Sequence, residues 1–321
     1  MDTVYFGGGT PTLLSADQLE ELLSTVRASY SVSPDAEITA ECNPATADRI
    51  KLLRMRRAGI NRLSIGLQSA NQRELQALGR CHSFADFMET WQNARAAGFD
   101  NLSADVMSGI PYQTPESWLF TLEQVCSLCP EHLSAYGLTI EDGTPFARRK
   151  AELPLPDEES ARKMYFDGIR FLSDRGFRQY EISNYARPGY ESRHNLKYWN
   201  CEPYLGFGPA AYSDFQGVRF GNLRDLAAYT DSKDITAERE SPSLWERANE
   251  YVMLRLRLSD GVSVAAFEAR FGGSFAASFG NALERYVPGG FVRKMPDGYA
   301  LTPEGMYVSN SILSDILDFP E

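Results

Sequence analysis

Short apolar runs alternate with amphipathic stretches through the first half of the chain. The apolar runs have the length of β-strands and occupy residues 3–6, 37–41, 62–66, 102–107, 132–138 and 179–183. The amphipathic stretches have helical periodicity and occupy residues 15–30, 46–58, 84–97, 115–128 and 157–175. Ser15 with Gln18, and Ser83 with Asp86, match the capping box that opens a helix. This alternation predicts an α/β fold with a parallel sheet, either open or closed into a barrel.

The pattern changes after about residue 187. Residues 187–217 are rich in Gly, Pro, Tyr and Asn, which predicts an ordered loop. Residues 241–321 predict helices followed by a hairpin, whose turn is Pro296-Asp297-Gly298. This order is typical of a small winged-helix-like module, and its few basic residues favour a structural role over DNA binding. We therefore expect a barrel at 1–188, a loop and connecting segment at 189–236, and a C-terminal domain at 237–321.

The charge balance argues against a nucleic acid partner. The chain has 32 basic and 43 acidic residues and a formal net charge of −11, whereas phosphate backbones are bound by clustered Lys and Arg. No apolar run approaches the roughly 18 residues of a membrane span, and no charged-then-apolar leader follows Met1. The 5 cysteines are scattered and odd in number, which does not suit a secreted disulfide framework. We expect a cytoplasmic protein without a transmembrane segment.

Polar residues lie at or near the ends of successive predicted strands. A glycine-rich turn, Gly7–Thr10, follows the first strand, and glycines let a ligand approach the backbone closely. Glu41, Gln68, Arg80 and Asp105 follow at later strand ends. Each of these side chains alone is more often a solvated loop residue. Together at the carboxyl edge of a parallel sheet, where ligands bind, they predict a site that suits a zwitterionic nucleoside.

The order and spacing of several motifs resemble one family. The motifs are GGGTPT at 7–12, E-x-N-P at 41–44, G-x-Q-S at 66–69, L-G-R-x-H-S at 78–83 and D-x-M-x-G-x-P at 105–111. They resemble the oxygen-independent coproporphyrinogen III oxidase-like group of the radical S-adenosylmethionine (SAM) superfamily, and the likeness continues to about residue 317. The resemblance implies a partial (β/α)6, TIM-like barrel that lacks its first strand. A small C-terminal domain of helical, winged-helix-like type should follow.

The resemblance also implies a set of SAM contacts. The family positions that contact SAM correspond here to Gly8, Gly9, Thr10, Glu41, Gln68, Arg80 and Asp105. In this assignment the segment Gly8–Thr10 meets the amino group of methionine, Arg80 faces its carboxylate, and Asp105 binds the ribose.

A second motif, H-N-x-x-Y-W at 194–199, resembles the signature of the heme chaperones known as HemW. A His beside Tyr and Trp offers a nitrogen ligand and flat apolar surfaces to a macrocycle. The resemblance implies His194 as a ligand of heme iron, Tyr198 and Trp199 near the porphyrin, and apo-hemoproteins of respiration as partners. A loop histidine packed under two aromatic rings is the alternative, and Cys201 is another candidate ligand.

The motif that should hold the iron–sulfur cluster is absent. In this family a C-x3-C-x2-C loop after the first strand carries a [4Fe-4S] cluster, and SAM chelates its fourth iron. No C-x3-C-x2-C occurs in the sequence, and Cys126 and Cys129 form a C-x2-C without a third partner, which predicts buried apolar residues. We expect an N-terminally shortened chain without catalytic activity. Whether it is a fragment or a natural form that has lost radical chemistry stays open.

Three functions remain open at this point. The first is a heme chaperone that binds heme and delivers it to apo-proteins, with SAM and a [4Fe-4S] cluster in the intact form. The second is an enzyme of heme biosynthesis that decarboxylates coproporphyrinogen III oxidatively without oxygen. The third is a structural or regulatory remnant that binds neither ligand. The H-N-x-x-Y-W motif and the missing cluster motif favour the first.

Overall fold

The computed structural model describes residues 1–317, and the chain divides into two compact units. Met1–His194 form the first unit, and the residues from Asn195 onward form the second. Helix α8 (Arg193–Trp199) contains the junction between the two units. None of the helices within residues 1–317 is long and apolar enough to cross a membrane.

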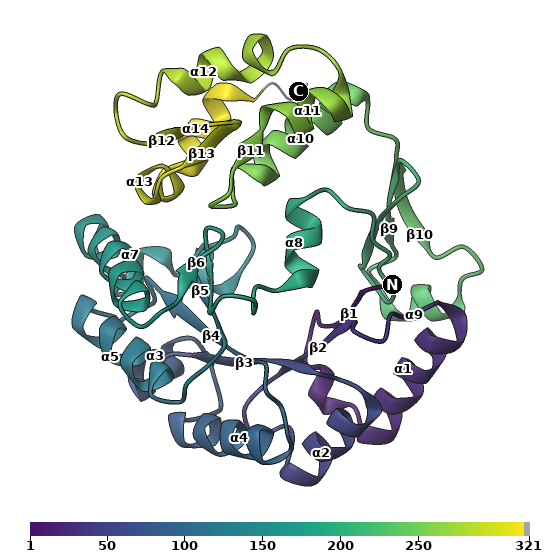
Figure 1. Ribbon diagram of the computed structural model, residues 1–321. Coiled ribbons are helices and arrows are strands. Elements are labelled where there is room, and N and C mark those ends of the chain that lie inside the picture. The colour runs from purple at the N-terminus through teal and green to yellow at the C-terminus, as the bar shows by residue number, and fades with distance from the viewer. Residues whose placement is uncertain (318–321) are drawn as a thin grey trace. The chain divides into compact units, whose positions relative to one another are not determined.

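The first unit is built on a 7-stranded sheet with the order β1-β2-β3-β4-β5-β7-β6 (Figure 1). The parallel strands are β1 (Thr3–Phe6), β2 (Glu37–Cys42), β3 (Arg62–Gln68), β4 (Leu102–Ser108) and β5 (His132–Gly137). Two short antiparallel strands, β7 (Asn184–Ala186) and β6 (Arg178–Gln179), complete the sheet. The expected α/β fold with a parallel sheet is therefore confirmed.

Helices cover the convex side of the sheet (Figure 1). They are α1 (Ala16–Ser29), α2 (Arg49–Ala58), α3 (Gln72–Ala77), α4 (Phe84–Ala96), α5 (Pro115–Cys126) and α7 (Glu158–Ser173), with short turns η1 (Pro11–Leu13), α6 (Pro145–Arg148) and η2 (Lys150–Glu152) elsewhere. Both expected capping boxes are present, at Ser15 with Gln18 and at Ser83 with Asp86. Because these caps are local, the sequence predicts the starts of α1 and α4 well.

Side chains along the parallel strands alternate between two environments. The apolar ones join the core beneath the helices and include Ile38, Ala40, Leu63, Ile65, Leu67, Leu102, Ala104, Val106 and Leu133. The polar ones face the concave side, where hydrogen bonds join neighbouring strands, as between Ser64 and Asp105. We call this polar concave face the barrel interior. Parallel strands are usually apolar on both faces, so the alternation itself marks a face that is used for something other than packing.

The strand expected at residues 179–183 is wrong in detail. Residues Tyr180–Ser183 connect β6 to β7 instead of forming a strand. The Glu181 carboxylate accepts a hydrogen bond from the Ser183 N–H at 3.1 Å and another from the Asn184 amide. Such side-chain bonds compete with a strand ladder and favour a turn.

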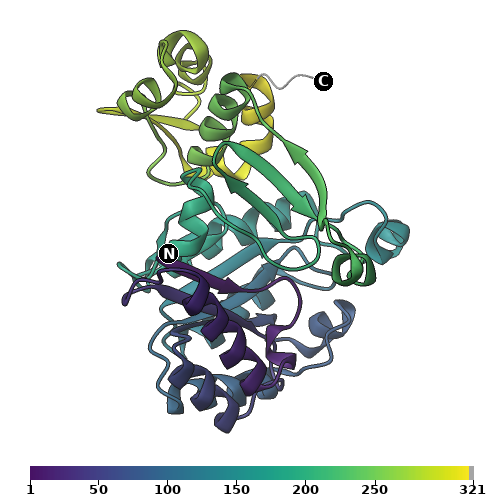
Figure 2. The same ribbon diagram turned by 90° about the vertical axis from the view of Figure 1, so that its right-hand side faces the viewer.

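The second unit begins with an antiparallel sheet of β8 (Tyr212–Phe215), β9 (Val218–Asn222) and β10 (Thr236–Glu240), which run side by side in Figure 2. Helix α9 (Leu226–Asp231) lies between β9 and β10 in the sequence. Neither the strands nor α9 were expected from the sequence.

In the rest of this unit helices are followed by a hairpin, as expected, and two further short helices that were not expected follow the hairpin. Its helices are α10 (Leu244–Arg255), α11 (Val264–Phe271), the π-turn η3 (Ala276–Gly280), α12 (Asn281–Glu284), α13 (Pro303–Tyr307) and α14 (Ser309–Ile316). Strands β12 (Val292–Met295) and β13 (Gly298–Leu301) pair around Pro296 and Asp297, and the short β11 (Val262–Ser263) joins them. Phe267, Phe275 and Phe279 pack against one another inside it. The expected small C-terminal domain with helices and a hairpin is therefore confirmed.

Candidate functional site

The glycine-rich turn after β1 lies against Glu41 of β2. Gly8 has a left-handed backbone (φ 87°) and donates its N–H to the Glu41 carboxylate at 3.3 Å. The Tyr5 hydroxyl donates to the other oxygen of the same carboxylate at 3.0 Å. A Cβ at Gly7 would lie 2.5 Å from the Tyr5 ring, so glycine is required there. Glu41 thus holds both the turn and Tyr5 in place.

Thr10, at the end of this turn, contacts the residue that follows β2. Its hydroxyl accepts a hydrogen bond from the Asn43 amide at 2.9 Å, and Asn43 follows the last residue of β2. This contact joins the Thr of the first motif to the Asn of the second. The predicted residues Gly8, Thr10 and Glu41 therefore share one neighbourhood.

Asp105 lies deeper than the sequence suggested. It occupies the middle of β4 and not the strand's end, and its side chain points into the barrel interior. The Ser64 hydroxyl lies 2.9 and 3.0 Å from its two oxygens. Burial raises the pKa of Asp105 to about 6, and the negative charge of Glu41 acts in the same direction. Hydrogen bonds from Ser134 and Ser64 and the charge of Arg62 oppose this rise.

Tyr5 is a member of this group that the sequence did not reveal. Burial raises the pKa of its hydroxyl well above the ordinary value, and the charges of Glu41 and Asp105 raise it further. The hydroxyl is therefore a hydrogen-bond donor over the whole physiological range. The signal that could have found it is the alternation in β1, which places Thr3 and Tyr5 on the same face as the polar residues of β2.

Gln68 ends β3 in a strained conformation. Its backbone φ is 65°, which is uncommon for a residue other than glycine, and the pairing of β3 with β4 shifts register between Gly66 and Gln68. The side chain is only 7% exposed. Bulges and positive φ values of this kind concentrate at functional sites, which is consistent with a role for Gln68 in binding.

Arg80 is positioned by the end of α3. Gly79 adopts the left-handed conformation (φ 70°), and the Arg80 N–H donates to the carbonyl of Leu75 at 2.9 Å. Two residues later, His82 places Nε2 3.2 Å from the carbonyl of Leu67, at the end of β3. The short segment that carries Arg80 is therefore tied at both ends, one of them next to Gln68.

The H-N-x-x-Y-W motif lies on a helix, so the expectation of a loop there is wrong. The N–H groups of Arg193 and His194, at the start of α8, donate to the two oxygens of Glu37 at 3.1 and 2.9 Å. This cap comes from β2, 156 residues away from Arg193. The residues next to the helix in the sequence therefore carry no pattern that predicts it.

The His194 ring contacts two residues of β1. Its Nδ1 lies 3.0 Å from the Thr3 hydroxyl. Its ring stacks on Tyr5, with centroids 5.0 Å apart and an angle of 22° between the planes. Since Tyr5 also binds Glu41, the histidine of the second motif is linked to the first group of predicted residues through a single side chain.

Tyr198 and Trp199, which belong to the second unit, have different surroundings. The Tyr198 ring meets Tyr204 edge to face, with centroids 4.7 Å apart. The Arg257 guanidinium lies 4.4 Å from the centroid of Trp199, a cation–π contact. One face of the Trp199 ring is therefore in contact with a positive charge.

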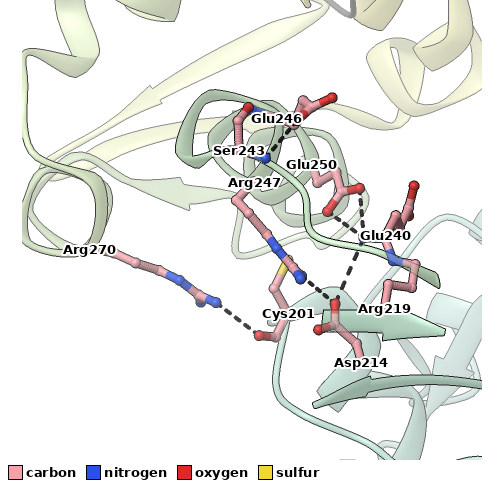
Figure 3. Close-up of polar contacts among 9 residues, drawn as sticks. All are labelled: Cys201, Asp214, Arg219, Glu240, Ser243, Glu246, Arg247, Glu250 and Arg270. Carbon is pink, nitrogen blue, oxygen red and sulfur yellow. Dashed lines mark hydrogen bonds and ion pairs between the residues drawn. The ribbon is translucent and has the colours of Figure 1, made fainter. Parts of the chain in front are cut away.

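Cys201 lies beside a group of charged residues in the second unit (Figure 3). Arg270 donates to its carbonyl oxygen at 2.9 Å. Burial raises the pKa of the Cys201 thiol to about 11, so it is protonated at neutral pH and is a poor thiolate ligand. This environment weakens the case for Cys201 as a heme ligand.

These charged residues connect the antiparallel sheet of β8, β9 and β10 to α10 (Figure 3). Asp214 of β8 accepts a hydrogen bond from Arg247 of α10. Arg219 of β9 lies 2.7 Å from Glu250 of α10 and 3.0 Å from Glu240 of β10. These partly buried pairs hold β8, β9 and β10 against the helix that starts at the Ser243–Glu246 capping box.

The residues of this chain do not fit an iron–sulfur cluster. Within residues 1–317, no group of three or more His, Cys, Asp or Glu side chains is arranged to hold a metal ion. Cys126 ends α5, and burial raises the pKa of its thiol to about 11. Cys129 is exposed, which corrects the expectation that both thiols of the C-x2-C would be buried. It follows the helix end with a positive φ of 51°, which leaves it outside the core.

Comparisons with known proteins place these features in a family. Residues 1–125 match the family model of the radical SAM superfamily, and residues 243–308 match the HemN C-terminal domain. The heme chaperone HemW of Bacillus subtilis is 34% identical over 331 residues, which cover 99% of this chain and 86% of that protein. The heme chaperone HemW of Escherichia coli is 34% identical over 316 residues, which cover 97% of this chain and 82% of that protein.

Two further comparisons add a eukaryotic relative and a solved structure. The mouse mitochondrial "radical S-adenosyl methionine domain-containing protein 1" is 45% identical over 238 residues, a match that spans 73% of this chain and 54% of the mouse protein. The chain therefore spans about half the length of this relative. Coproporphyrinogen III oxidase (HemN) from Escherichia coli, described as a radical SAM enzyme, has a TM-score of 0.86 at 24% identity. That match covers 100% of this chain and 78% of the other, and it shows a shared fold.

The barrel fold, with polar residues lining its interior and a HemN-type C-terminal domain, defines a radical SAM protein. Within that superfamily the chain belongs to the HemN/HemW-like group, which includes the heme chaperones named HemW. The family expected from the sequence motifs is thereby confirmed.

Proposed function

We propose that this chain is a heme chaperone that binds heme and delivers it to apo-hemoproteins of respiration in the cytoplasm. The placement of His194 carries the proposal. A metal-bound histidine usually has its second ring nitrogen held by an oxygen partner, and the Thr3 hydroxyl is such a partner for Nδ1. We therefore assign Nε2 of His194 to the heme iron.

Relatives that carry the name heme chaperone support this proposal over nearly the whole chain. We place Tyr198 and Trp199 near the macrocycle, because aromatic rings stack on a porphyrin through dispersion and apolar burial. In this proposal residues 1–188 bind SAM, 189–236 carry the heme motif, and 237–321 form the C-terminal domain.

The proposal also includes SAM in the barrel interior. The chemistry of the residues there fits a zwitterionic nucleoside. We assign Gly8, Gly9, Thr10 and Glu41 to the amino group of the methionine moiety and its surroundings, Arg80 to the carboxylate, and Asp105 with Gln68 to the nucleoside. When bound, SAM would supply a sulfonium group. The residues present do not fit a cluster, so the function that we propose for this chain is binding and not radical chemistry.

A heme titration of the purified chain tests this proposal. We expect one heme per chain, with a Soret band whose position changes when His194 is replaced by Ala. Cys201→Ala is the matched control, because Cys201 lies two residues beyond Trp199, and it should leave the spectrum and the affinity unchanged.

Three results would count against the assignment. His194→Ala with an unaltered Soret position and affinity would remove His194 as the ligand. A changed Soret position or heme affinity in Cys201→Ala would indicate that the Cys201 thiol is the ligand. Binding of several hemes per chain without saturation would indicate adsorption to apolar surface.

A further inference from the structure

A chain of hydrogen bonds crosses the barrel interior below the residues already described. It runs from the Asp105 carboxylate to the Ser103 hydroxyl (3.4 Å), and from there to Nδ1 of His132 (2.8 Å). Nε2 of His132 lies 2.8 Å from the Tyr180 hydroxyl, and the Ser192 N–H donates to that hydroxyl at 3.3 Å. Ser192 immediately precedes α8, the helix that carries His194.

The groups between Asp105 and α8 are buried. Ser103 and His132 are each 0% exposed and Tyr180 is 6% exposed. Breaking one of these contacts would leave a buried polar atom without a partner, which is unfavourable. This series of hydrogen bonds is therefore a fixed part of the fold and not a transient surface contact.

When Asp105 is ionised, only one assignment of donors and acceptors fits this series of hydrogen bonds. A carboxylate only accepts, so Ser103 donates its proton to Asp105. The Ser103 oxygen then accepts from His132, which places the histidine proton on Nδ1. Nε2 is left to accept the proton of Tyr180, whose oxygen accepts from the Ser192 N–H.

The electrostatic surroundings support this direction. Burial lowers the pKa of His132 well below its ordinary value, and the charge of Arg62 acts in the same direction. Burial raises the pKa of Tyr180 well above its ordinary value. Both rings are therefore neutral, and a neutral histidine has only one ring proton to place.

We infer that His132 and Tyr180 are positioning residues that connect Asp105 to the start of α8, and so to His194. The two rings reach Asp105 and the start of α8 through Ser103 and Ser192. A ligand that donates a hydroxyl proton to Asp105 would polarise the chain of bonds, and the effect would reach the backbone next to His194. The identity of that ligand rests on the proposed function, but the connection itself does not.

Nuclear magnetic resonance of the protein with 15N-labelled histidine rings tests this inference without heme or SAM. The sequence has 3 histidines, so the ring signals can be assigned by substituting His82 and His194 in turn. We expect His132 to be neutral and protonated on Nδ1 throughout the range from about pH 6.5 to 8. A proton on Nε2, or a titration of His132 in this range, would overturn the inference.

Tyr180→Phe tests the link to α8. It removes the acceptor of the Ser192 N–H and the donor to His132. We expect shifts in the ring signals of both His132 and His194. Tyr185→Phe is the matched control, because Tyr185 is also buried (4% exposed) and neighbours the same short strands, and it should leave both signals in place.

Ser103→Ala provides a second variant that changes little volume. It removes the acceptor of Nδ1, so His132 should lose its single tautomer. If Tyr180→Phe folds and leaves the His194 signals unchanged, the connection to α8 is wrong. Because these readouts concern the ligand-free chain, they are separate from a failure of heme binding, which would contradict only the proposed function.

Discussion

The Nδ1 atom of His194 lies 3.0 Å from the hydroxyl of Thr3, although 191 residues separate the two. This contact fixes the orientation of the imidazole ring relative to β1. The same ring stacks on Tyr5, so two neighbouring inward-facing residues of one strand determine where the histidine points. Within the first unit, the histidine that we assign to heme is therefore held by the strand that leads into the glycine-rich turn.

Thr3→Val should weaken heme binding without abolishing it. The substitution keeps the size of the side chain but removes the hydrogen bond to Nδ1. A neutral hydrogen bond contributes about 0.5–1.5 kcal/mol, so we expect a loss of affinity of about 2- to 12-fold in a heme titration. Thr25→Val, on the exposed face of α1, is the control. Equal affinities for Thr3→Val and the wild type would show that the contact does not orient the ligand.

Asp105→Asn should change the pH dependence of stability. The folded-state pKa of about 6 is above the ordinary 3.8. The folded chain therefore binds more protons between these values, and its stability falls as the pH rises through 6. The asparagine side chain of the variant does not titrate, so the variant does not lose stability in this way as the pH rises. Urea unfolding should show that the stability of the variant relative to the wild type rises by about 2–3 kcal/mol from about pH 4 to pH 7.5. A constant difference would contradict the raised pKa.

SAM binding by this chain should be weak. Without a cluster to chelate the amino and carboxylate groups, the remaining contacts are hydrogen bonds of about 0.5–1.5 kcal/mol, or about 1.5–3 kcal/mol where a charge takes part. Calorimetry should show little heat at micromolar SAM and a further loss in Asp105→Ala. A tight complex that Asp105→Ala leaves intact would remove Asp105 from the site.

Iron–sulfur reconstitution should fail on the chain as it stands. The sequence lacks C-x3-C-x2-C, and a [4Fe-4S] cluster needs four thiolates, or three with a chelating substrate. Anaerobic treatment with iron and sulfide should leave far fewer than about four irons per chain after desalting. The broad visible absorbance of a cluster, with about four irons bound, would contradict this prediction.

The sequence predicted those parts of the structure whose determinants are local. The starts of α1 and α4 follow from Ser15 and Ser83, which cap the helix that each precedes. The hairpin of β12 and β13 follows from its two-residue turn at Pro296 and Asp297. Local caps and turns leave a signal within a few residues, and such signals can be found without the fold.

The parts that the sequence could not predict depend on distant contacts. Helix α8 is capped by Glu37 from β2, so its own flanks are typical of a loop. The role of Tyr5 arises only when β1 brings it to Glu41 and His194. Asp105 was found by its motif, but its depth in the barrel interior follows from the pairing of β4 with β3 and β5.

Resonance Raman spectroscopy of the ferrous heme complex, with ring-15N histidine, tests the central claim most directly. The proposal predicts an iron–histidine band that shifts with the isotope in the wild type and in His82→Ala, and that is absent in His194→Ala. A band that persists in His194→Ala, or a wild-type spectrum without any isotope-sensitive iron–histidine band, would contradict the assignment of His194 as the ligand of the heme iron.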